Sequence, residues 1–119
     1  YKVAENEKFF AFLDINPLVK GHTLVVPKQE VDYIFDLSDE DLAAMHVFAK
    51  KIARAIEKAF PCKKVGEAVI GLEVPHAHIH LIPIQKESDM LFSNPKLKLA
   101  DDEFVSIAKA ISSAYETAK

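Results

Sequence analysis

Apolar residues fall in short runs near the start of the chain and recur every three or four positions further along it. Residues 2–5 and 8–14 have the composition of two strands, and the polar residues around Asn6 are typical of a tight turn between them. A proline and a glycine in residues 16–21 predict a second turn, and residues 22–27 form an apolar run that ends in Pro27. The start of the chain therefore predicts a hairpin followed by a third strand.

The hydrophobic period changes at Ser38. Beyond this residue, apolar side chains recur at the spacing of an amphipathic helix, and Ser38 with Asp41 forms an S-x-x-D start signal. The apolar stripe consists of Leu42, Met45, Ala49, Ile52, Ala53 and Ile56. We expect a long helix that ends near Pro61. His46 falls beside the stripe, and we interpret it as an ordinary surface or boundary residue.

Two further strands and a second helix are predicted in the remainder of the chain. Residues 64–71 and 74–84 are strands, and residues 85–99 lack a clean period and predict a long ordered loop. A helix begins at Asp101 or Asp102, with its apolar positions at Phe104, Ile107, Ala108, Ile111 and Tyr115. This order of elements predicts an α+β fold, in which helices cover one face of an antiparallel sheet and leave the other face free for a site.

Composition narrows the class of protein. The chain has 119 residues, half of them apolar, so we expect a single domain over residues 1–119, preceded by a missing segment because Tyr1 already lies in a strand. The formal net charge is −3 with lysine and arginine spread along the chain, which argues against a nucleic-acid partner. No apolar stretch is long enough for a membrane span or a signal peptide, and Cys62 has no partner for an internal disulfide, so we expect a cytoplasmic protein.

Three of the five histidines stand at alternate positions among small and apolar residues: His76, His78 and His80. In a strand these three side chains share one face, while Ala77 and Ile79 between them enter the core. A rise of about 3.3 Å per residue places the outer two roughly 13 Å apart, which is too far for all three to bind one tetrahedral metal ion. At most two of the three histidines can therefore bind the same metal ion.

Three interpretations of this pattern are open. The histidines can form a solvated polar face, although lysine, glutamate or threonine is commoner in such positions. A pair, either His76 with His78 or His78 with His80, can bind a metal ion with His22 or Glu73 as the third ligand. Alternatively, the middle histidine is a nucleophile, because a pKa of about 6.5 leaves imidazole mostly neutral near neutral pH.

A second segment favours the nucleophile. Residues 76–82, His-Ala-His-Ile-His-Leu-Ile, resemble the His-φ-His-φ-His-φ-φ signature of the histidine triad (HIT) superfamily, in which φ is apolar. Residues 12–17 followed by residues 21–28 resemble the other characteristic stretch of that superfamily, and the resemblance, closest to its bacterial Hint-like branch, runs from Tyr1 to about Ile84. It implies a five-stranded antiparallel sheet with a long helix, usually paired into a homodimer. It also implies that the protein binds a nucleotide and, without a cofactor, hydrolyses or transfers it at the α-phosphate.

The resemblance assigns roles to the histidines of the motifs. His78 attacks phosphorus and becomes transiently nucleotidylated, and His76 helps to orient it. His80 and His22 contact the phosphate oxygens and the leaving group. Histidine donors can stabilise charge on phosphoryl oxygens without a metal ion, which agrees with these roles.

The resemblance also implies a nucleoside pocket. Asp14 takes the ribose hydroxyls, and one ionised carboxylate can accept hydrogen bonds from both of them. An alternative for Asp14 is the formation of the turn before Asn16 and Pro17. The apolar walls around the base are Phe12, Leu13, Ile15 and Leu24.

The chain departs from the family pattern in the segment before the triad. The loop there is shortened, since residues 69–73 run almost directly into Val74, and the missing segment expected before Tyr1 is the one that helps to form the base pocket in the family. Glu73 lies where the Hint-like branch often has a serine near the leaving group. A carboxylate there repels anionic leaving groups and tolerates amines. We therefore expect a purine nucleoside phosphoramidate or an aminoacyl adenylate as substrate, rather than a dinucleoside polyphosphate.

Two hypotheses of different class follow. The first is a metal-independent nucleotidyl hydrolase or transferase that acts through a covalent intermediate at His78. The second is a catalytically weak nucleotide-binding or regulatory module of the same fold, which the departures favour. A dinucleoside polyphosphate hydrolase and a metal-dependent hydrolase are further alternatives. No role is predicted for the loop residues Lys86, Ser88, Asp89, Met90 and Phe92.

Overall fold

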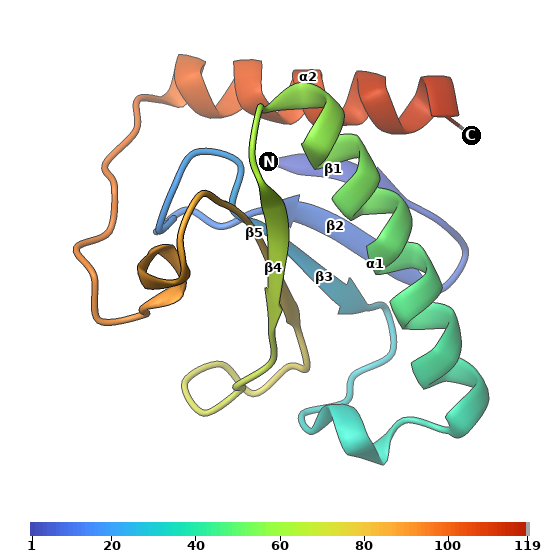
Figure 1. Cartoon of the computed structure of the whole chain (residues 1–119). Coiled ribbons are helices and arrows are strands. Elements are labelled where there is room, and N and C mark those ends of the chain that lie inside the picture. The colour runs from blue at the N-terminus through green and yellow to red at the C-terminus, as the bar shows by residue number, and fades with distance from the viewer. Residues whose placement is uncertain (119) are drawn as a thin grey trace.

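Five strands form a single antiparallel sheet in the computed structural model, which describes residues 1–118 (Figure 1). The strands are β1 (Lys2–Glu5), β2 (Phe9–Leu13), β3 (Thr23–Pro27), β4 (Lys64–Ala68) and β5 (Ile79–Ile84), in the spatial order β1-β2-β3-β5-β4. The helices are α1 (Asp39–Ala59) and α2 (Asp101–Ala118), with the short 3₁₀ helices η1 (Ile34–Asp36) and η2 (Glu87–Met90). The predicted α+β fold is confirmed; Lys119 lies outside the described residues.

Both long helices pack on one face of this sheet. The alternation along β2 and β3 sends Ala11, Leu13 and Val25 to that face, where they join the buried residues of α1 and α2 in one hydrophobic core. Helix α1 begins as predicted, because the Ser38 hydroxyl accepts a hydrogen bond from the Asp41 N–H. The opposite face carries the half-buried side chains of β2 and β3 together with His80 of β5.

The histidine strand is shorter than the sequence predicted. Ala68, the last residue of β4, pairs with His80, and residues 69–78 between them leave the sheet, so β4 also ends before the predicted residues 69–71. Gly71 has a φ of +77°, and the His76 N–H donates to the Val74 carbonyl in a tight turn. The prediction of a strand over residues 74–78 is therefore wrong, and His80 is the one triad histidine that lies in a strand.

The connection from β5 to α2 is ordered, as predicted, and contains η2. It crosses the sheet face opposite the helices, because Met90 packs against Gly66 of β4 and the Leu97 N–H donates to the Pro17 carbonyl. The sheet face opposite the helices is therefore free beside β2 and β3, as expected, but the connection covers it over His80. Within residues 1–118, none of the helices is both long and apolar enough to cross a membrane.

Candidate active site

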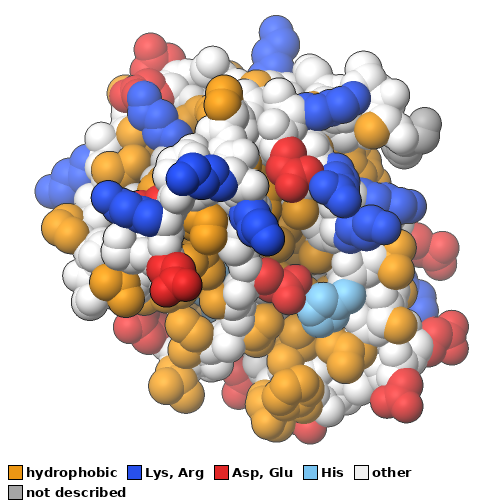
Figure 2. Space-filling model, viewed as in Figure 1, with side chains coloured by type: hydrophobic (Ala, Val, Ile, Leu, Met, Phe, Trp, Pro, Cys, Tyr) orange, Lys and Arg blue, Asp and Glu red, His pale blue; other side chains and the backbone are white. Residues whose placement is uncertain are grey.

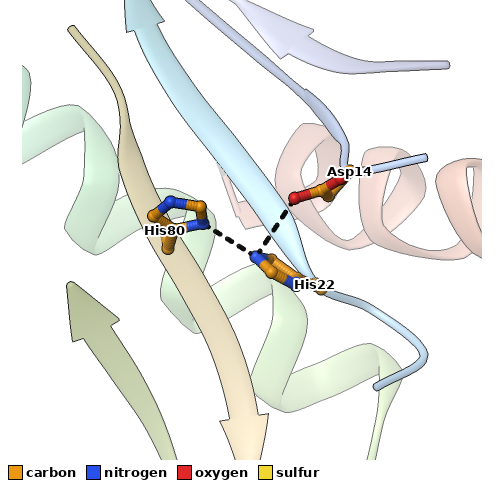
Figure 3. A group of neighbouring side chains, drawn as sticks. All are labelled: Asp14, His22 and His80. Carbon is orange, nitrogen blue, oxygen red and sulfur yellow. Dashed lines mark hydrogen bonds and ion pairs between the residues drawn. The ribbon is translucent and has the colours of Figure 1, made fainter. Parts of the chain in front are cut away.

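Asp14, His22 and His80 come together from three separate parts of the chain (Figure 3). Asp14 follows β2, His22 precedes β3, and His80 lies in β5 next to Leu24 of β3. The turn that delivers His22 contains Gly21, whose φ is +96°. An L side chain rarely adopts this conformation, so glycine at this position lets the chain turn into β3 with His22 directed inward.

The two buried histidines form a hydrogen-bonded chain. The Leu18 N–H donates to His22 Nδ1 at 3.0 Å, so the proton of the neutral His22 ring must be on Nε2. His22 Nε2 lies 2.9 Å from His80 Nδ1, and its N–H therefore donates to that atom. The proton of His80 is in turn on its own Nε2, which has no acceptor within residues 1–118 and can donate to a ligand.

Burial keeps both rings of this chain neutral. Desolvation, followed by the nearby His22 and His78 rings, lowers the pKa of His80 to about 4. Desolvation also lowers the pKa of His22, and Lys96 and His78 add to this effect against the opposing attraction of Asp14. Near pH 7 the site therefore offers a neutral Nε2–H donor at His80 and not an imidazolium.

His78 has the opposite tautomer. Its Nδ1 lies 2.8 Å from the His76 carbonyl oxygen, which can only accept, so Nδ1 carries the proton and Nε2 carries the lone pair. The ring stands edge-on to His80, with ring centroids 4.8 Å apart. The His76 side chain points elsewhere, since its Nε2–H donates to the Pro27 carbonyl at 2.8 Å. His76 thus contacts His78 through its backbone carbonyl, and its ring ties the residues before β5 to the end of β3.

Asp14 takes part in a turn and also faces His22. Its Oδ1 accepts a hydrogen bond from the Asn16 N–H at 2.8 Å, which is the turn that the sequence offered as an alternative role. Its Oδ2 lies 3.6 Å from His22 Nε2, which is too long for a strong hydrogen bond (Figure 3). One carboxylate oxygen and the remaining lone pair of the other are available to a ligand.

The same three side chains are close enough to hold a metal ion, since their ligand atoms lie within 4.8 Å of one another. Both nitrogens of His22, however, already have hydrogen-bond partners. A metal ion bound by His22 and His80 would have to replace the hydrogen bond between them. The hydrogen bonds of His22 therefore explain, without a metal ion, why the His22 and His80 rings lie close together.

Comparison with known proteins identifies the family. The family model described as HIT domain matches residues 1–87. This chain belongs to the HIT family. It is 35% identical over 120 residues to an uncharacterized HIT-like protein of Borreliella burgdorferi, covering 94% of this chain and 86% of that protein. It is 33% identical over 114 residues to adenosine 5′-monophosphoramidase hnt1 of Schizosaccharomyces pombe, with the same coverages.

Solved structures agree with this assignment. The crystal structure of a Hit-like protein involved in cell-cycle regulation from Bartonella henselae superposes with a TM-score of 0.80 at 30% sequence identity, covering 95% of this chain and 84% of that one. The five-stranded sheet with its long helix is thus the HIT fold. The sequence resemblance predicted both the family and the fold.

The apolar residues expected around the base of a HIT ligand do not all lie together. Phe12 and Leu24 are directly paired on neighbouring strands and face away from the helices, and Ile15 is exposed in the following turn. Leu13 is 3% exposed and belongs to the core on the helix side, which corrects its expected place beside Phe12. Adjacent residues of a strand face opposite ways, so the two cannot form one wall.

Glu73 and Phe92 lie in the connections before and after β5. Glu73 is exposed in the connection that leads to His78. Phe92, for which no role was predicted, lies edge-on to His80 with ring centroids 4.7 Å apart. An aromatic residue in a long loop after the HIT match was the available signal, but nothing local indicates which way such a loop folds.

Proposed function

We propose that this HIT protein is a nucleotidyl hydrolase that cleaves a purine nucleoside phosphoramidate through a covalent intermediate on His78. One observation carries the proposal: the His78 ring has its lone pair on Nε2 and stands 4.8 Å, between ring centroids, from His80, whose Nε2–H is a donor. A nucleophile and a donor for a phosphoryl oxygen are thus adjacent. The relative named an adenosine 5′-monophosphoramidase supports the same chemistry.

The reaction proceeds in two displacements. His78 Nε2 attacks the α-phosphorus, an N–P bond to His78 forms, and the P–N bond to the leaving amine breaks with its electron pair remaining on the amine, which takes a proton from solvent. Water then attacks phosphorus, the bond to His78 breaks, and the water proton returns to solvent. The products are the amine and the nucleoside monophosphate. His80 donates its Nε2–H to a phosphoryl oxygen in both steps.

The nucleoside lies over β2 and β3 in this proposal. Phe12 and Leu24 are half-buried on the face opposite the helices and contact the base, with Ile15 beside them. Asp14 accepts hydrogen bonds from the ribose hydroxyls while its Oδ1 keeps the turn to Asn16. The sugar is thereby held next to the histidine cluster.

An amine leaving group is favoured over a phosphate chain. Glu73 is exposed close in sequence to His78, and its negative charge repels an anionic leaving group. Glu73→Gln is expected to increase the rate for a diadenosine polyphosphate relative to that for an adenosine phosphoramidate. A rate ratio that Glu73→Gln leaves unchanged would remove this preference from the proposal.

The decisive experiment is a turnover assay on an adenosine 5′-phosphoramidate with a fluorescent amine, in the presence of EDTA. Wild type and His46→Ala, which alters an exposed histidine on α1, are expected to cleave it. His78→Ala is expected to lose about 10³-fold or more in kcat. Mass spectrometry after alkaline quenching should detect the adenylyl group on His78. Binding of AMP without cleavage by wild type would instead favour the nucleotide-binding module.

We also propose that the protein is a homodimer. β4 is an edge strand, and none of the strands within residues 1–118 pairs with its outer side. A hollow beside its end is lined by exposed apolar residues of two segments, among them Tyr33, Phe35, Ile70 and Leu72, and it extends to His78. Apolar side chains gather at this end of the molecule, below β4 in the view of Figure 2. A second copy would cover both the edge and these side chains.

A further inference from the structure

The loop between β5 and α2 is held over the histidine cluster by contacts outside the family motifs. From residue 88 onward it lies beyond the HIT-domain match. Met90 packs so closely on Gly66 of β4 that a Cβ there would lie 2.6 Å from the Met90 sulfur. Further along, the Leu97 N–H donates to the Pro17 carbonyl at 2.9 Å. These two contacts hold the loop in place before and after Phe92.

Phe92 lies between these two anchors and covers His80. Its ring stands edge-on to His80, with ring centroids 4.7 Å apart and an angle of 71° between the planes, and 6.3 Å from the His22 ring. The His78 ring also stands edge-on to His80, with ring centroids 4.8 Å apart. Lys96 donates to the carbonyls of Phe92 and Asn94, which closes the turn that carries the phenyl ring. His80 is left only 8% exposed.

We infer that Phe92 is a positioning residue, whose ring shields the hydrogen bond between His22 and His80 from water and holds His80 as the Nε2–H tautomer. The inference rests on the proposed function, because the tautomer of His80 affects catalysis only if its Nε2–H contacts the substrate. An edge-on aromatic ring suits this task, since it fills the space beside an imidazole without competing for its hydrogen bonds.

The charged groups around His80 make such a cover necessary. His22 faces it from the turn before β3, and His78 from the residues before β5. Asp14 Oδ2 lies 3.6 Å from the same His22 nitrogen that faces His80, and Lys96 comes from the loop. The Asp14 carboxylate favours a positive charge on this pair of rings. A protonated His80 would carry hydrogen on Nδ1, directly opposite the N–H of His22, and the bond between the rings would break. Removal of the apolar cover would admit water and promote this change.

Nitrogen NMR of the ¹⁵N-labelled full chain tests the inference directly, because ring ¹⁵N shifts report both tautomer and protonation of His80. In Phe92→Ala we expect a mixture of His80 tautomers and a pKa about one pH unit or more above that of wild type. Leu91→Ala is the matched control, since Leu91 is the exposed neighbour in the same loop, and it should titrate like wild type. Phe92→Leu, which keeps an apolar cover, should fall between.

The pH dependence of turnover gives a second readout. The acidic limb of the Phe92→Ala profile should move to higher pH together with the pKa of His80. The ratio of kcat at pH 8 to kcat at pH 5 should therefore be at least about twofold larger for Phe92→Ala than for wild type. Leu91→Ala should keep the wild-type profile. An equal loss at every pH in both variants would indicate a merely structural loop and would overturn the inference.

Unchanged tautomer and titration of His80 in a folded Phe92→Ala protein would also overturn it. If Phe92→Ala does not fold, Phe92→Leu decides by the same measurement, because leucine is smaller than phenylalanine and covers His80 only in part: a raised pKa with mixed tautomers supports the inference, and wild-type behaviour overturns it. If wild type cleaves no phosphoramidate, the proposed function fails. The NMR result still shows whether Phe92 positions His80.

Discussion

His22 Nε2 lies 2.9 Å from His80 Nδ1, and the direction of the hydrogen bond between them is decided by a backbone group on the far side of His22. The Leu18 N–H occupies His22 Nδ1, which leaves Nε2 as the only donor of that ring. A turn residue thereby determines that His80 presents an N–H, and not a lone pair, to a ligand. His78 presents a lone pair for the corresponding reason at the His76 carbonyl.

Replacement of His22 by alanine tests the first of these relationships. Without His22 the Nδ1 atom of His80 has no donor, so both tautomers become accessible and the ring is free to turn. We expect kcat for the phosphoramidate to fall by about 10²-fold, in the range typical of a lost proton-transfer or donor group. His46→Ala, on exposed α1 surface, is the control and should keep wild-type kcat. A folded His22→Ala protein within twofold of wild type would contradict this assignment.

Asp14→Asn separates the two possible roles of Asp14. Asparagine keeps a side-chain oxygen that can accept from the Asn16 N–H, so the turn is retained, but it removes the charge. If the carboxylate binds the ribose, AMP should bind about tenfold more weakly, the scale of a charged hydrogen bond, whereas an AMP analogue without ribose hydroxyls should be unaffected. Isothermal titration calorimetry gives both affinities. Equal weakening for the two ligands would favour the turn as its only role.

The parts of the fold that the sequence predicted correctly depend on local patterns. Ser38 with Asp41 marks the start of α1, and the apolar period of α1 and α2 follows from the faces that they bury. The extent of β5 could not be read in this way, because it depends on where β4 ends: the pairing of Ala68 with His80 is a contact between separate strands.

The site shows the same division between local and long-range information. The motif residues His22 and His80 could be selected from the sequence, but their contact spans 58 positions and its direction depends on Leu18. Leu13 was misplaced even though alternation in a strand already separates it from Phe12. Phe92 could not be assigned, because its position depends on contacts that the loop makes elsewhere.

Gly21→Ala should destabilise the protein more than Gly71→Ala. Both glycines have positive φ, +96° and +77°, so alanine is strained at either position. At Gly21 a Cβ would also lie 3.2 Å from Pro83 and 3.3 Å from Phe60, whereas nothing lies within 4 Å at Gly71. We expect a loss of about 1 kcal/mol at Gly71 and about 2–3 kcal/mol at Gly21, measured by urea unfolding. Equal losses would contradict a packing contribution at Gly21.

Stability should fall as the pH is lowered from 7.5 to 5.5. His80 binds its proton near pH 6.5 in the unfolded chain but only near pH 4 in the folded one, since its pKa is lowered to about 4. Between these values the unfolded state binds more protons, so the free energy of unfolding decreases as pH falls. The expected loss from His80 is about 1 kcal/mol over this interval, with His22 adding in the same direction.

Urea unfolding of wild type and His80→Gln at pH 7.5, 6.5 and 5.5 checks this dependence. Glutamine does not titrate, so the variant should lose less stability across the interval, whatever its stability at pH 7.5. The interval lies above the range in which carboxylates respond; Glu5, for example, has a pKa lowered to about 2 by its hydrogen bonds from Lys2 and Lys28. Identical pH dependence in both proteins would show that His80 is not held neutral by folding.

The proposed homodimer predicts that an acidic residue at the end of β4 separates the subunits. Ile70 and Leu91 are each 53% exposed, but only Ile70 lines the apolar hollow beside β4. Ile70→Asp would bury a carboxylate in the interface without a partner, a change that costs several kcal/mol, whereas Leu91→Asp leaves the carboxylate in water. Light scattering should give twice the chain mass of 13.3 kDa for wild type and Leu91→Asp, and the single mass for Ile70→Asp. A monomeric wild type, or an Ile70→Asp dimer as stable as wild type, would mean that a second copy does not cover this end of β4.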